Sequence, residues 1–148
     1  MNSQSKISIY TDGACKGNPG KGGWGAILEY NGKIKEINGF SEQTTNNMME
    51  LTAVIESLKI LKRSCNIIIT TDSQYVKNGI TKWIHNWKKN GWRTANKKPV
   101  KNKELWMLLD KSIIGHSIEW KWIKGHSGHP QNERADELAN LAIEKLEI

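Results

Sequence analysis

Two acidic residues directly follow segments that are typical of β-strands. Asp12 comes after Lys6–Thr11, which alternates apolar and polar side chains, and Asp72 comes after Asn66–Thr71, an isoleucine-rich segment typical of a buried central strand. Groups at the carboxyl ends of neighbouring strands in an open sheet converge in one crevice. A carboxylate there is costly to bury unless a cation or hydrogen-bond donors pair with it. The two positions therefore indicate a shared cation site, although a strand-end turn or a helix cap at Asp72-Ser73 is the alternative.

Two more acidic residues lie on predicted helices. Glu50 falls in the first turns of a helix predicted over Thr45–Leu61, close to its apolar stripe. Asp136 falls two turns into a helix predicted from Pro130 to about Leu146, next to Ala135. Each could also be an ordinary solvent-exposed helix acid, because acidic residues are usually solvated.

Four acidic side chains in one crevice would repel one another unless cations lay between them. Hard divalent ions with oxygen ligands, Mg²⁺ or Mn²⁺, suit such a site. Two ions about 3.5–4 Å apart would fit phosphoryl chemistry, because one would hold and acidify the attacking water while the other stabilised the leaving oxygen. The residue types therefore predict a metal-dependent site made of Asp12, Glu50, Asp72 and Asp136.

The elements that would position these acids form a single predicted α/β domain over residues 1–148. Gly22–Tyr30 and Lys33–Phe40 are predicted strands joined by Asn31-Gly32, the dipeptide most typical of a hairpin turn. Glycines on both sides of Asn18-Pro19, from Gly13 to Gly23, predict a loop or broad turn. A three-stranded meander continued by βα crossovers gives a mixed five-stranded sheet with helices on both faces. The other predicted elements are a helical segment over Ser73–Asn90 with a break near Gly79, a loop over Gly91–Val100, a helix over Asn102–Ile114, a strand over Ile118–Lys124 and a glycine-flanked loop over Gly125–His129.

The positive charge of the chain is concentrated in one segment. The 148 residues carry 22 Lys and Arg against 15 Asp and Glu, a formal net charge of +7. Residues 81–103, called here the basic segment, hold eight of the basic residues and no acidic one, so the rest of the chain has a net charge of −1. The same segment contains Trp83, Trp87 and Trp92. Cations mixed with aromatic rings predict contact with nucleic acid, and the alternative is a solvated lysine-rich hairpin whose tryptophans form a small local core.

Several protein classes are disfavoured by the composition. The two cysteines, Cys15 and Cys65, are fifty residues apart, which excludes a disulfide scaffold or a zinc knuckle and favours a reducing compartment. The first ten residues have no apolar core of a secretion signal, and no apolar run approaches the length of a membrane helix. We therefore expect a cytoplasmic protein without a membrane partner, and a monomer.

Taken together, these motifs give a close resemblance to type 1 ribonuclease H, in its bacterial stand-alone form. The resemblance covers essentially the whole chain, and a set of this kind in this order is very specific. The matching stretches are Tyr10-Thr11-Asp12-Gly13, Gly17-Asn18-Pro19-Gly20, Thr44-Thr45-Asn46-Asn47-Met48-Met49-Glu50-Leu51, Thr71-Asp72-Ser73-Gln74-Tyr75-Val76, Trp83-Ile84-His85-Asn86-Trp87, Val100-Lys101-Asn102 and the stretch from Lys124 through His126 to Asp136.

The resemblance implies the ribonuclease H-like fold and an endonuclease that cuts the RNA strand of RNA–DNA hybrids, leaving 5′-phosphate and 3′-hydroxyl ends. It places the metal-binding quartet of the family on Asp12, Glu50, Asp72 and Asp136, with Mg²⁺ or Mn²⁺, two ions per site, as the cofactor. It places the family's flexible-loop histidine on His126, between Gly125 and Gly128, where an imidazole could transfer protons near neutral pH.

The resemblance also implies contacts with both strands of the hybrid. Positions that read the minor groove, where 2′-hydroxyls mark the RNA strand, match Cys15, Asn18, Asn46, Asn47 and Gln74. A pocket for a phosphate of the DNA strand matches Thr45 and Asn102, and a channel for that strand matches Trp83, Trp87 and Thr94. The family often has an arginine two residues before the pocket threonine, where this chain has Gln43. The basic segment matches the family's basic protrusion, with Lys88, Lys89, Lys97 and Lys98 as contacts.

Two other functions remain open from the sequence. One is a module that binds hybrid or double-stranded nucleic acid and has lost catalysis, although a pure binder would have no reason to keep a repulsive acidic cluster. The other is a nuclease of the same broad fold that acts on DNA strands, as integrases do. The basic segment and the asparagines at positions 18, 46 and 47 are features against this second alternative.

Overall fold

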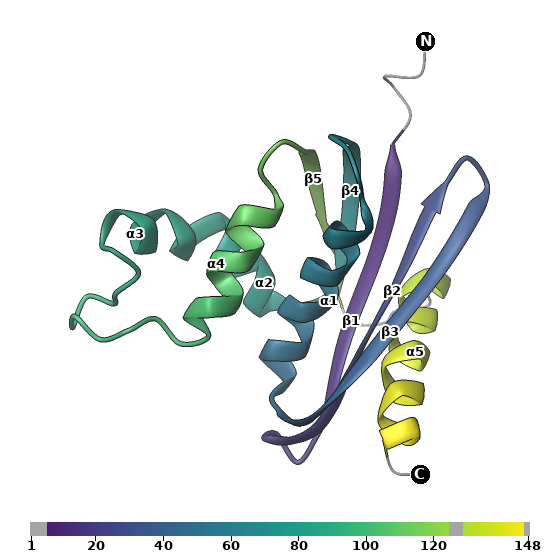
Figure 1. Cartoon of the computed structure of the whole chain (residues 1–148), viewed down its shortest axis with the longest axis horizontal. Helices are drawn as coiled ribbons and strands as arrows, with labels where there is room; N and C mark the ends of the chain where they lie inside the picture. Colours follow the sequence, from purple (N-terminus) through teal and green to yellow (C-terminus); the bar gives the residue numbers. More distant parts are fainter. Residues whose placement is uncertain (1–5, 125–128, 147–148) are drawn as a thin grey trace.

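A mixed five-stranded sheet with helices on both faces forms the fold, as the sequence predicts (Figure 1). The computed structural model describes residues 6–124 and 129–146. The strand order is β3-β2-β1-β4-β5. The first three strands pair antiparallel, and β4 pairs parallel with both β1 and β5. The strands are β1 (Ile7–Lys16), β2 (Gly20–Tyr30), β3 (Lys33–Thr44), β4 (Asn66–Thr71) and β5 (Ser117–Trp122).

The helices lie in two layers. Neighbouring residues of β2 show this directly, because a Cβ atom at Gly22 would meet Met49 of α1, whereas one at Gly23 would meet Ala139 of α5. Helix α4 packs on the α1 side, away from α5 (Figure 1). No helix among residues 6–124 and 129–146 is long and apolar enough to cross a membrane. The helices are α1 (Asn46–Ile60), α2 (Gln74–Asn78), the π-helical turn η1 (Gly79–Trp83), α3 (Ile84–Lys89), α4 (Lys103–Ser112) and α5 (Pro130–Leu146).

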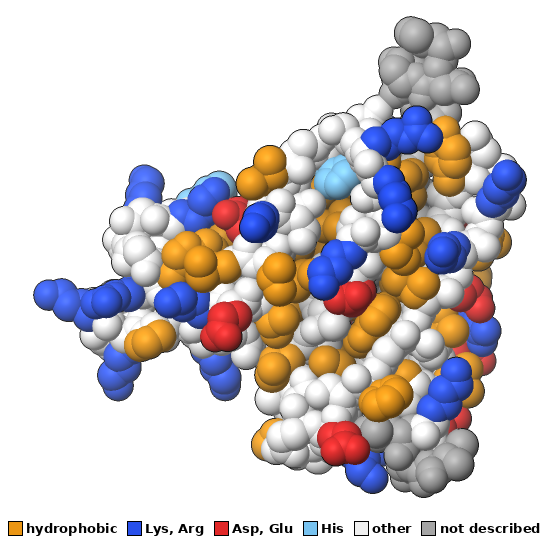
Figure 2. All heavy atoms as spheres, viewed as in Figure 1, with side chains coloured by type: hydrophobic (Ala, Val, Ile, Leu, Met, Phe, Trp, Pro, Cys, Tyr) orange, Lys and Arg blue, Asp and Glu red, His pale blue; other side chains and the backbone are white. Residues whose placement is uncertain are grey.

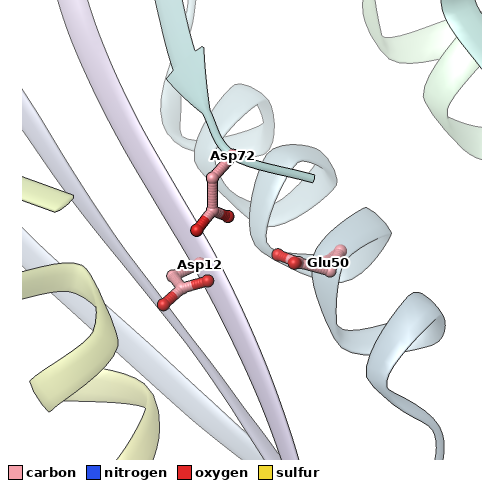
Figure 3. Close-up of side chains that lie close together, drawn as sticks. All are labelled: Asp12, Glu50 and Asp72. Carbon is pink, nitrogen blue, oxygen red and sulfur yellow. The ribbon is translucent and has the colours of Figure 1, made fainter. Parts of the chain in front are cut away.

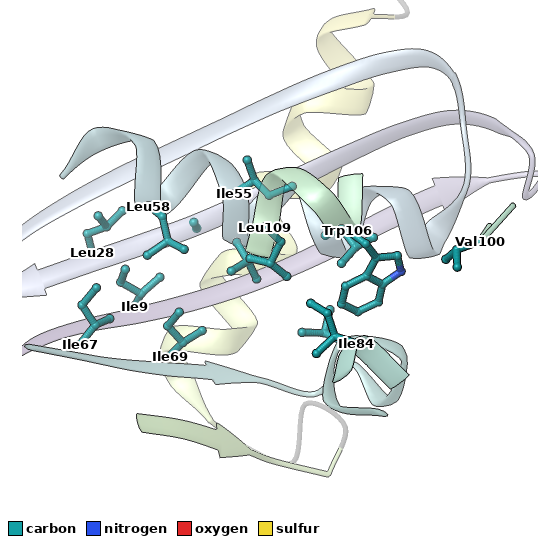
Figure 4. Packing of buried hydrophobic residues seen from close by; sticks show 14 residues of the cluster. Ile9, Leu28, Ile55, Leu58, Ile67, Ile69, Ile84, Val100, Trp106 and Leu109 are labelled. Carbon is teal, nitrogen blue, oxygen red and sulfur yellow. The ribbon is translucent and has the colours of Figure 1, made fainter. Parts of the chain in front are cut away.

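The hydrophobic core lies between the sheet and the layer of α1 and α4 (Figure 4). Ile9 and Ile69 come from the two central strands, and both are fully buried. Leu51 on the apolar stripe of α1 belongs to the same buried cluster. Trp106 of α4 is also fully buried in it, at the end of the core nearest the basic segment. Burying a side chain of this size stabilises a fold by about 1.5–3 kcal/mol. The core therefore fixes α1 against β1, which carries Asp12, and β4, which Asp72 directly follows.

The most informative difference from the prediction concerns the first hairpin. The predicted strand over Lys6–Thr11 is too short, because β1 continues to Lys16 and pairs along its length with β2. The predicted broad loop shrinks to residues 17–19. The glycine pattern predicts turn formers, but in this hairpin several glycines allow helices to approach the strand backbone closely. As a result, Asp12 lies inside a strand and not at its end.

The other boundaries differ by a few residues. The Asn31-Gly32 turn is confirmed, with φ angles of 50° and 79° that fit the predicted hairpin. The break predicted near Gly79 is a π-helical turn within a continuous helical segment. The last strand ends at Trp122, two residues earlier than predicted, and α4 is shorter than the predicted Asn102–Ile114 helix at both ends. Residues 125–128 of the predicted loop lie outside the described residues.

The two helices that start near Glu50 and Asp72 are each N-capped by a side-chain hydroxyl. Thr45 caps α1 and its Oγ1 accepts from the Met48 N–H at 3.2 Å, which agrees with the predicted helix start. Ser73 caps α2 and its Oγ accepts from the Val76 N–H at 3.1 Å. The cap predicted at Asp72-Ser73 is therefore confirmed at Ser73, and Asp72 is not the N-cap. Losing such a cap costs about 1 kcal/mol of stability.

Candidate active site

The parallel pairing of β1 with β4 brings Asp12 and Asp72 level with each other. The register runs from Ile7 opposite Ile67 to Tyr10 opposite Thr70, where the ladder ends. Two residues further along each strand direction are Asp12 and Asp72, beyond the last paired residues, where β4 ends and α2 is about to begin. The carboxyl ends of parallel strands are the usual ligand sites of open sheets.

Glu50 approaches the same point from α1. Its side chain is 7% exposed, so the solvent-exposed alternative for this acid is wrong. Carboxylate oxygens of Asp12, Glu50 and Asp72 lie within 4.8 Å of one another, and Figure 3 shows the three side chains turned toward a common point. Glu50 Oε1 is buried and has no hydrogen-bond partner among the residues that the structure describes. A buried acceptor of this kind suits a cation ligand.

Burial and the charges of neighbouring acids make Asp12 and Glu50 hard to ionise. The pKa of Asp12 is raised to about 8, mainly by burial and then by the nearby charge of Asp72. The neighbouring Asp136 side chain raises it further, and the Gly13 backbone opposes the rise with a smaller effect. Burial, followed by the charges of Asp12 and Asp72, raises the pKa of Glu50 well above its usual value. Shifts in this direction are typical of acids that share one site without a compensating positive charge.

Asp136 on α5 lies beside Asp12. Its side chain is close enough to raise the pKa of the Asp12 carboxyl. Asp136 is half-buried, and its Oδ1 also accepts from the Asn140 side-chain amide at 3.3 Å. The structure therefore brings together all four acids predicted from the sequence, three in a tight group and Asp136 next to Asp12.

Two contacts with β3 fasten α5 in this position. Asn38 donates from its side-chain amide to the Leu138 carbonyl at 2.8 Å. Arg134 forms a two-fold ion pair with Glu36, with N···O distances of 2.8 Å and 2.9 Å, and this pairing lowers the pKa of the Glu36 carboxyl. Both contacts lie within a turn of Asp136, so they help to hold its carboxylate at the site.

Most residues that the resemblance assigns to the minor groove lie around the start of α1. Asn18, in the β1–β2 turn, accepts through Oδ1 from the Asn46 N–H at 2.8 Å, which joins the turn to the helix. Cys15 donates from Sγ to the Thr44 carbonyl at 3.4 Å. Asn46 and Asn47 are exposed, and Gln74, the first residue of α2, is exposed as well.

The residues assigned to the DNA strand surround an aromatic cluster. Trp83 and Trp87 are half-buried, their ring centroids are 5.7 Å apart, and Trp87 also contacts the buried ring of Trp106 at 5.4 Å. The alternative of a small local tryptophan core is therefore confirmed as packing, and both rings keep intermediate exposure. Thr94 pairs with Lys98 through backbone and side-chain hydrogen bonds in the loop of the basic segment.

Tyr75 is a structural partner of Asn102 that the sequence does not predict. The side-chain amide of Asn102 donates to the Tyr75 hydroxyl at 3.0 Å, and the Trp106 Nε1–H donates to the same oxygen at 2.9 Å. Asn102 itself has a left-handed backbone with φ of 58°. The position of Tyr75 three residues after Asp72 was visible in the sequence, but its partners are about thirty residues away, so no local pattern indicated the contact.

The basic segment extends away from the sheet. Helix α3 and the loop that follows it project beyond α4 in Figure 1, and Figure 2 shows Lys and Arg side chains gathered on this projection. Lys88, Lys89, Lys97 and Lys98 are all exposed, and Lys88 also forms an ion pair with Asp110 of α4 at 3.3 Å. His126, the predicted proton-transfer residue, lies outside the described residues.

Comparison with known proteins identifies the family. Residues 4–144 match the family model described as RNase H. The chain belongs to the ribonuclease H family. The ribonuclease H of Hydrogenovibrio crunogenus is 61% identical to it over 141 residues, which cover 95% of this chain and 97% of that relative. The ribonuclease H of Neisseria gonorrhoeae is 63% identical over 134 residues, covering 90% and 92% of the two chains. The chain is therefore an enzyme of this family, as the resemblance implies.

Solved structures of other ribonucleases H agree with this fold. LC9-RNase H1, described as a type 1 RNase H with the type 2 active-site motif, superposes with a TM-score of 0.85 at 34% identity, over 95% of this chain and 73% of that chain. LC11-RNase H1, solved in complex with an RNA/DNA hybrid, has a TM-score of 0.75 at 26% identity, over 96% of this chain and 99% of that chain.

Proposed function

We propose that this ribonuclease H is a divalent-metal-dependent endonuclease that hydrolyses the RNA strand of RNA–DNA hybrids and leaves 5′-phosphate and 3′-hydroxyl ends. The observation that carries the proposal is the group of three carboxylates within 4.8 Å at the end of the β1–β4 ladder, with Asp136 beside them. The hybrid bound to LC11-RNase H1 supports the choice of substrate. A cytoplasmic location and a monomeric state stay predictions.

The donor set fits hard divalent cations. It consists of carboxylate oxygens alone, the preferred ligands of Mg²⁺ and Mn²⁺. Asp12 and Asp72, level with each other beyond the end of the ladder, would hold such ions together with Glu50 on one side and Asp136 on the other, and two ions suit a quartet of this charge. When bound, the ions would supply Lewis-acid chemistry, activating a water for attack on phosphorus and neutralising charge that develops on the phosphate.

The surrounding residues would orient the hybrid over this pocket. Exposed amides at Asn46, Asn47 and Gln74 would read the minor groove, because an amide can both donate to and accept from a 2′-hydroxyl. Asn18 uses its Oδ1 to hold Asn46, so its amide NH₂ is the group that would face the groove. Cys15 lies in the same strand as Asp12, three residues further along.

The DNA strand would run from α1 toward the basic segment. Thr45 and Asn102 would hold one of its phosphates, although Thr45 also caps α1 and Asn102 is tied to Tyr75. Trp83, Trp87 and Thr94 would line its path, with half-buried rings available for contact with sugars and bases. Gln43 removes a positive charge that the family often has next to this pocket, so the lysines of the basic segment would supply much of the attraction.

Removing the charge of the basic segment should weaken hybrid binding. We expect replacement of Lys88, Lys89, Lys97 and Lys98 by Ala to raise the hybrid Kd by about 10-fold or more at low salt, because each phosphate contact releases counterions. The slope of log Kd against log salt concentration should become shallower by up to about three units, less for Lys88 because Asp110 already pairs with it. Fluorescence anisotropy over a salt series with a labelled hybrid measures both quantities.

A matched variant controls for the overall change of charge. Lys33, Lys35, Lys59 and Lys62 are exposed and lie outside the basic segment. Their replacement by Ala removes the same four charges but should change the salt slope by less than about one unit. Equal slopes for the two quadruple variants would show that the basic segment has no special part in binding.

Loss of the His126 imidazole should slow turnover without ending it. We expect His126→Ala to lower kcat by about 10–100-fold, because proton transfer by a positioned side chain accelerates a reaction by roughly 10²–10⁴-fold and water can partly replace it. Multiple-turnover kinetics on a labelled hybrid give kcat and KM, with His85→Ala as a control on an exposed histidine of the basic segment. Complete loss of activity would mean that His126 has a more direct role.

One cleavage assay separates the proposed function from its rivals. Labelled RNA–DNA hybrid, duplex DNA and duplex RNA are incubated with the protein in Mg²⁺ and in a chelator. We expect Mg²⁺-dependent cutting of the RNA strand of the hybrid alone, with 5′-phosphate ends on the products. Binding without cutting would favour a catalytically inactive binding module, and cutting of duplex DNA would favour an integrase-like nuclease.

A further inference from the structure

Gly13 allows α1 to rest directly on β1 beside Asp12. A Cβ atom at this position would lie 2.6 Å from the Glu50 backbone nitrogen and 2.7 Å from the Met49 carbonyl carbon. Real Cβ atoms essentially never come closer than 3.0 Å to such neighbours. Both contacts are backbone atoms of the first turns of α1, so they cannot be relieved by rotating a side chain. The missing Cβ is therefore what allows Glu50 to reach the acids of the sheet.

Gly25 performs the same task for α5 on the opposite face of the sheet. It is the direct cross-strand partner of Asp12 in the β1–β2 ladder. A Cβ atom there would lie 2.3 Å from the Ala135 carbonyl oxygen and 2.7 Å from the Leu138 Cβ. Ala135 immediately precedes Asp136, so one of the points where α5 lies closest to β2 is next to the fourth acid.

The two glycines surround Asp12, one next to it along the chain and one opposite it across the ladder. An alanine at either position would push a helix outward by about 1 Å to restore an ordinary van der Waals separation. Misplacement of a reacting group by about 1 Å can cost roughly 100-fold in rate. Gly39 offers a contrast, since a Cβ there would lie 2.6–2.8 Å from the Trp24 ring and would meet neither acid-bearing helix.

We propose that Gly13 and Gly25 are positioning residues that set the depth of α1 and α5 on the sheet, and so the reach of Glu50 and Asp136 toward the metal ions held with Asp12 and Asp72. The proposal rests on the proposed function, because it assigns a purpose to distances within that metal site. It differs from a general packing role in one respect: small changes of helix depth should change metal affinity more than hybrid affinity.

The main test is Gly25→Ala compared with Gly39→Ala. We expect Gly25→Ala to weaken Mn²⁺ binding, measured by calorimetry on the protein without substrate, by about 10–100-fold. Its kcat should fall by a similar factor, while the hybrid Kd in chelator stays within about three-fold of the wild type. Gly39→Ala should keep Mn²⁺ affinity and kcat within about two-fold. Equal metal affinity in wild type and a folded Gly25→Ala would overturn the proposal.

A length change in the acid itself gives a second, independent readout. Asp136→Glu in the wild type should weaken Mn²⁺ binding by about 10-fold or more, because a fixed helix leaves no room for an extra methylene. In the Gly25→Ala background, where α5 stands further out, the same change should restore part of the lost affinity. If Gly25→Ala does not fold, Asp136→Glu alone decides, and an affinity within about three-fold of the wild type would contradict a fixed helix depth.

Failure of the proposed function gives a different pattern. If Asp12→Asn binds Mn²⁺ as tightly as the wild type, the acids are not the metal site and both proposals fall. If Asp12→Asn loses Mn²⁺ binding but Gly25→Ala and Asp136→Glu retain it, the metal site stands and only the positioning role is wrong.

Discussion

Asp12→Asn should lower the rate of hybrid cleavage by at least about 1,000-fold and leave hybrid binding in chelator within about three-fold of the wild type. Asp12 interacts with each of the other acids, since it lies in one group with Glu50 and Asp72 and its pKa is raised by Asp136. Asparagine keeps the size and shape of the side chain but removes its charge. A single-turnover time course on a 5′-labelled hybrid in Mg²⁺ measures the rate, and anisotropy measures binding.

Glu56→Gln provides the matched control for this variant. Glu56 lies on the solvent side of α1, where it pairs with Lys59 at 3.3 Å, and its charge is remote from the four acids. Its cleavage rate should remain within about two-fold of the wild type. Retention of more than about a tenth of wild-type activity by Asp12→Asn would show that this carboxylate is not essential to the metal site.

The fold was largely predictable because its elements carry strong local patterns. The isoleucines of β4, the apolar stripe of α1 and the proline that begins α5 predicted these elements within a residue or two of their bounds. The strand pairing also followed, since an Asn-Gly hairpin makes neighbouring strands antiparallel and a helical crossover makes them parallel. The convergence of Asp12 and Asp72 was therefore predictable from topology, whereas the resemblance was needed to assign Glu50 and Asp136 to the same site.

The depth of the helices on the sheet was not predictable from local patterns. Gly13 and Gly25 looked like turn or strand residues, and their use as contact points for α1 and α5 depends on backbone atoms far away in the sequence. The same applies to Tyr75, which joins Asn102 and Trp106 through hydrogen bonds across about thirty residues. Contacts of this kind depend on tertiary packing, for which a single sequence has no periodic signal.

The basic segment and the four acids, which are separate in the sequence, also occupy separate regions of the structure. The cations of the basic segment project away from the sheet, while the acids gather beyond the end of the β1–β4 ladder, with Asp12 and Glu50 buried. A phosphate would be attracted to the first region and repelled by the second until positive charge enters the pocket. Binding and catalysis should therefore be separable by mutation, which is why the lysine and Asp12 variants are expected to affect different measured quantities.

Without divalent metal, the wild type should lose stability as the pH rises from about 5 to 9. The pKa of Asp12 is raised from 3.8 to about 8 in the folded state, and that of Glu50 is raised in the same direction. Between these values the unfolded chain has already released protons that the folded chain still holds, so folding becomes less favourable with rising pH. One such group contributes a slope of at most about 1.4 kcal/mol per pH unit. Thermal unfolding followed by circular dichroism over this pH range measures the effect.

Mutation and metal should each reduce this pH dependence, for different reasons. Asp12→Asn removes the group with the raised pKa, so the metal-free variant should be more stable than the wild type by about 1–3 kcal/mol at pH 8.5, whereas Glu56→Gln should follow the wild type. Mg²⁺ at about 100 times its Kd should stabilise the wild type by about 2.7 kcal/mol, because it binds the folded state, and should affect Asp12→Asn far less. A wild type whose metal-free stability is flat from pH 5 to 9 would show that the four acids are not held together against their repulsion. Without that repulsion there would be no charge for a bound cation to compensate. The stability measurement therefore tests the metal site without any substrate present.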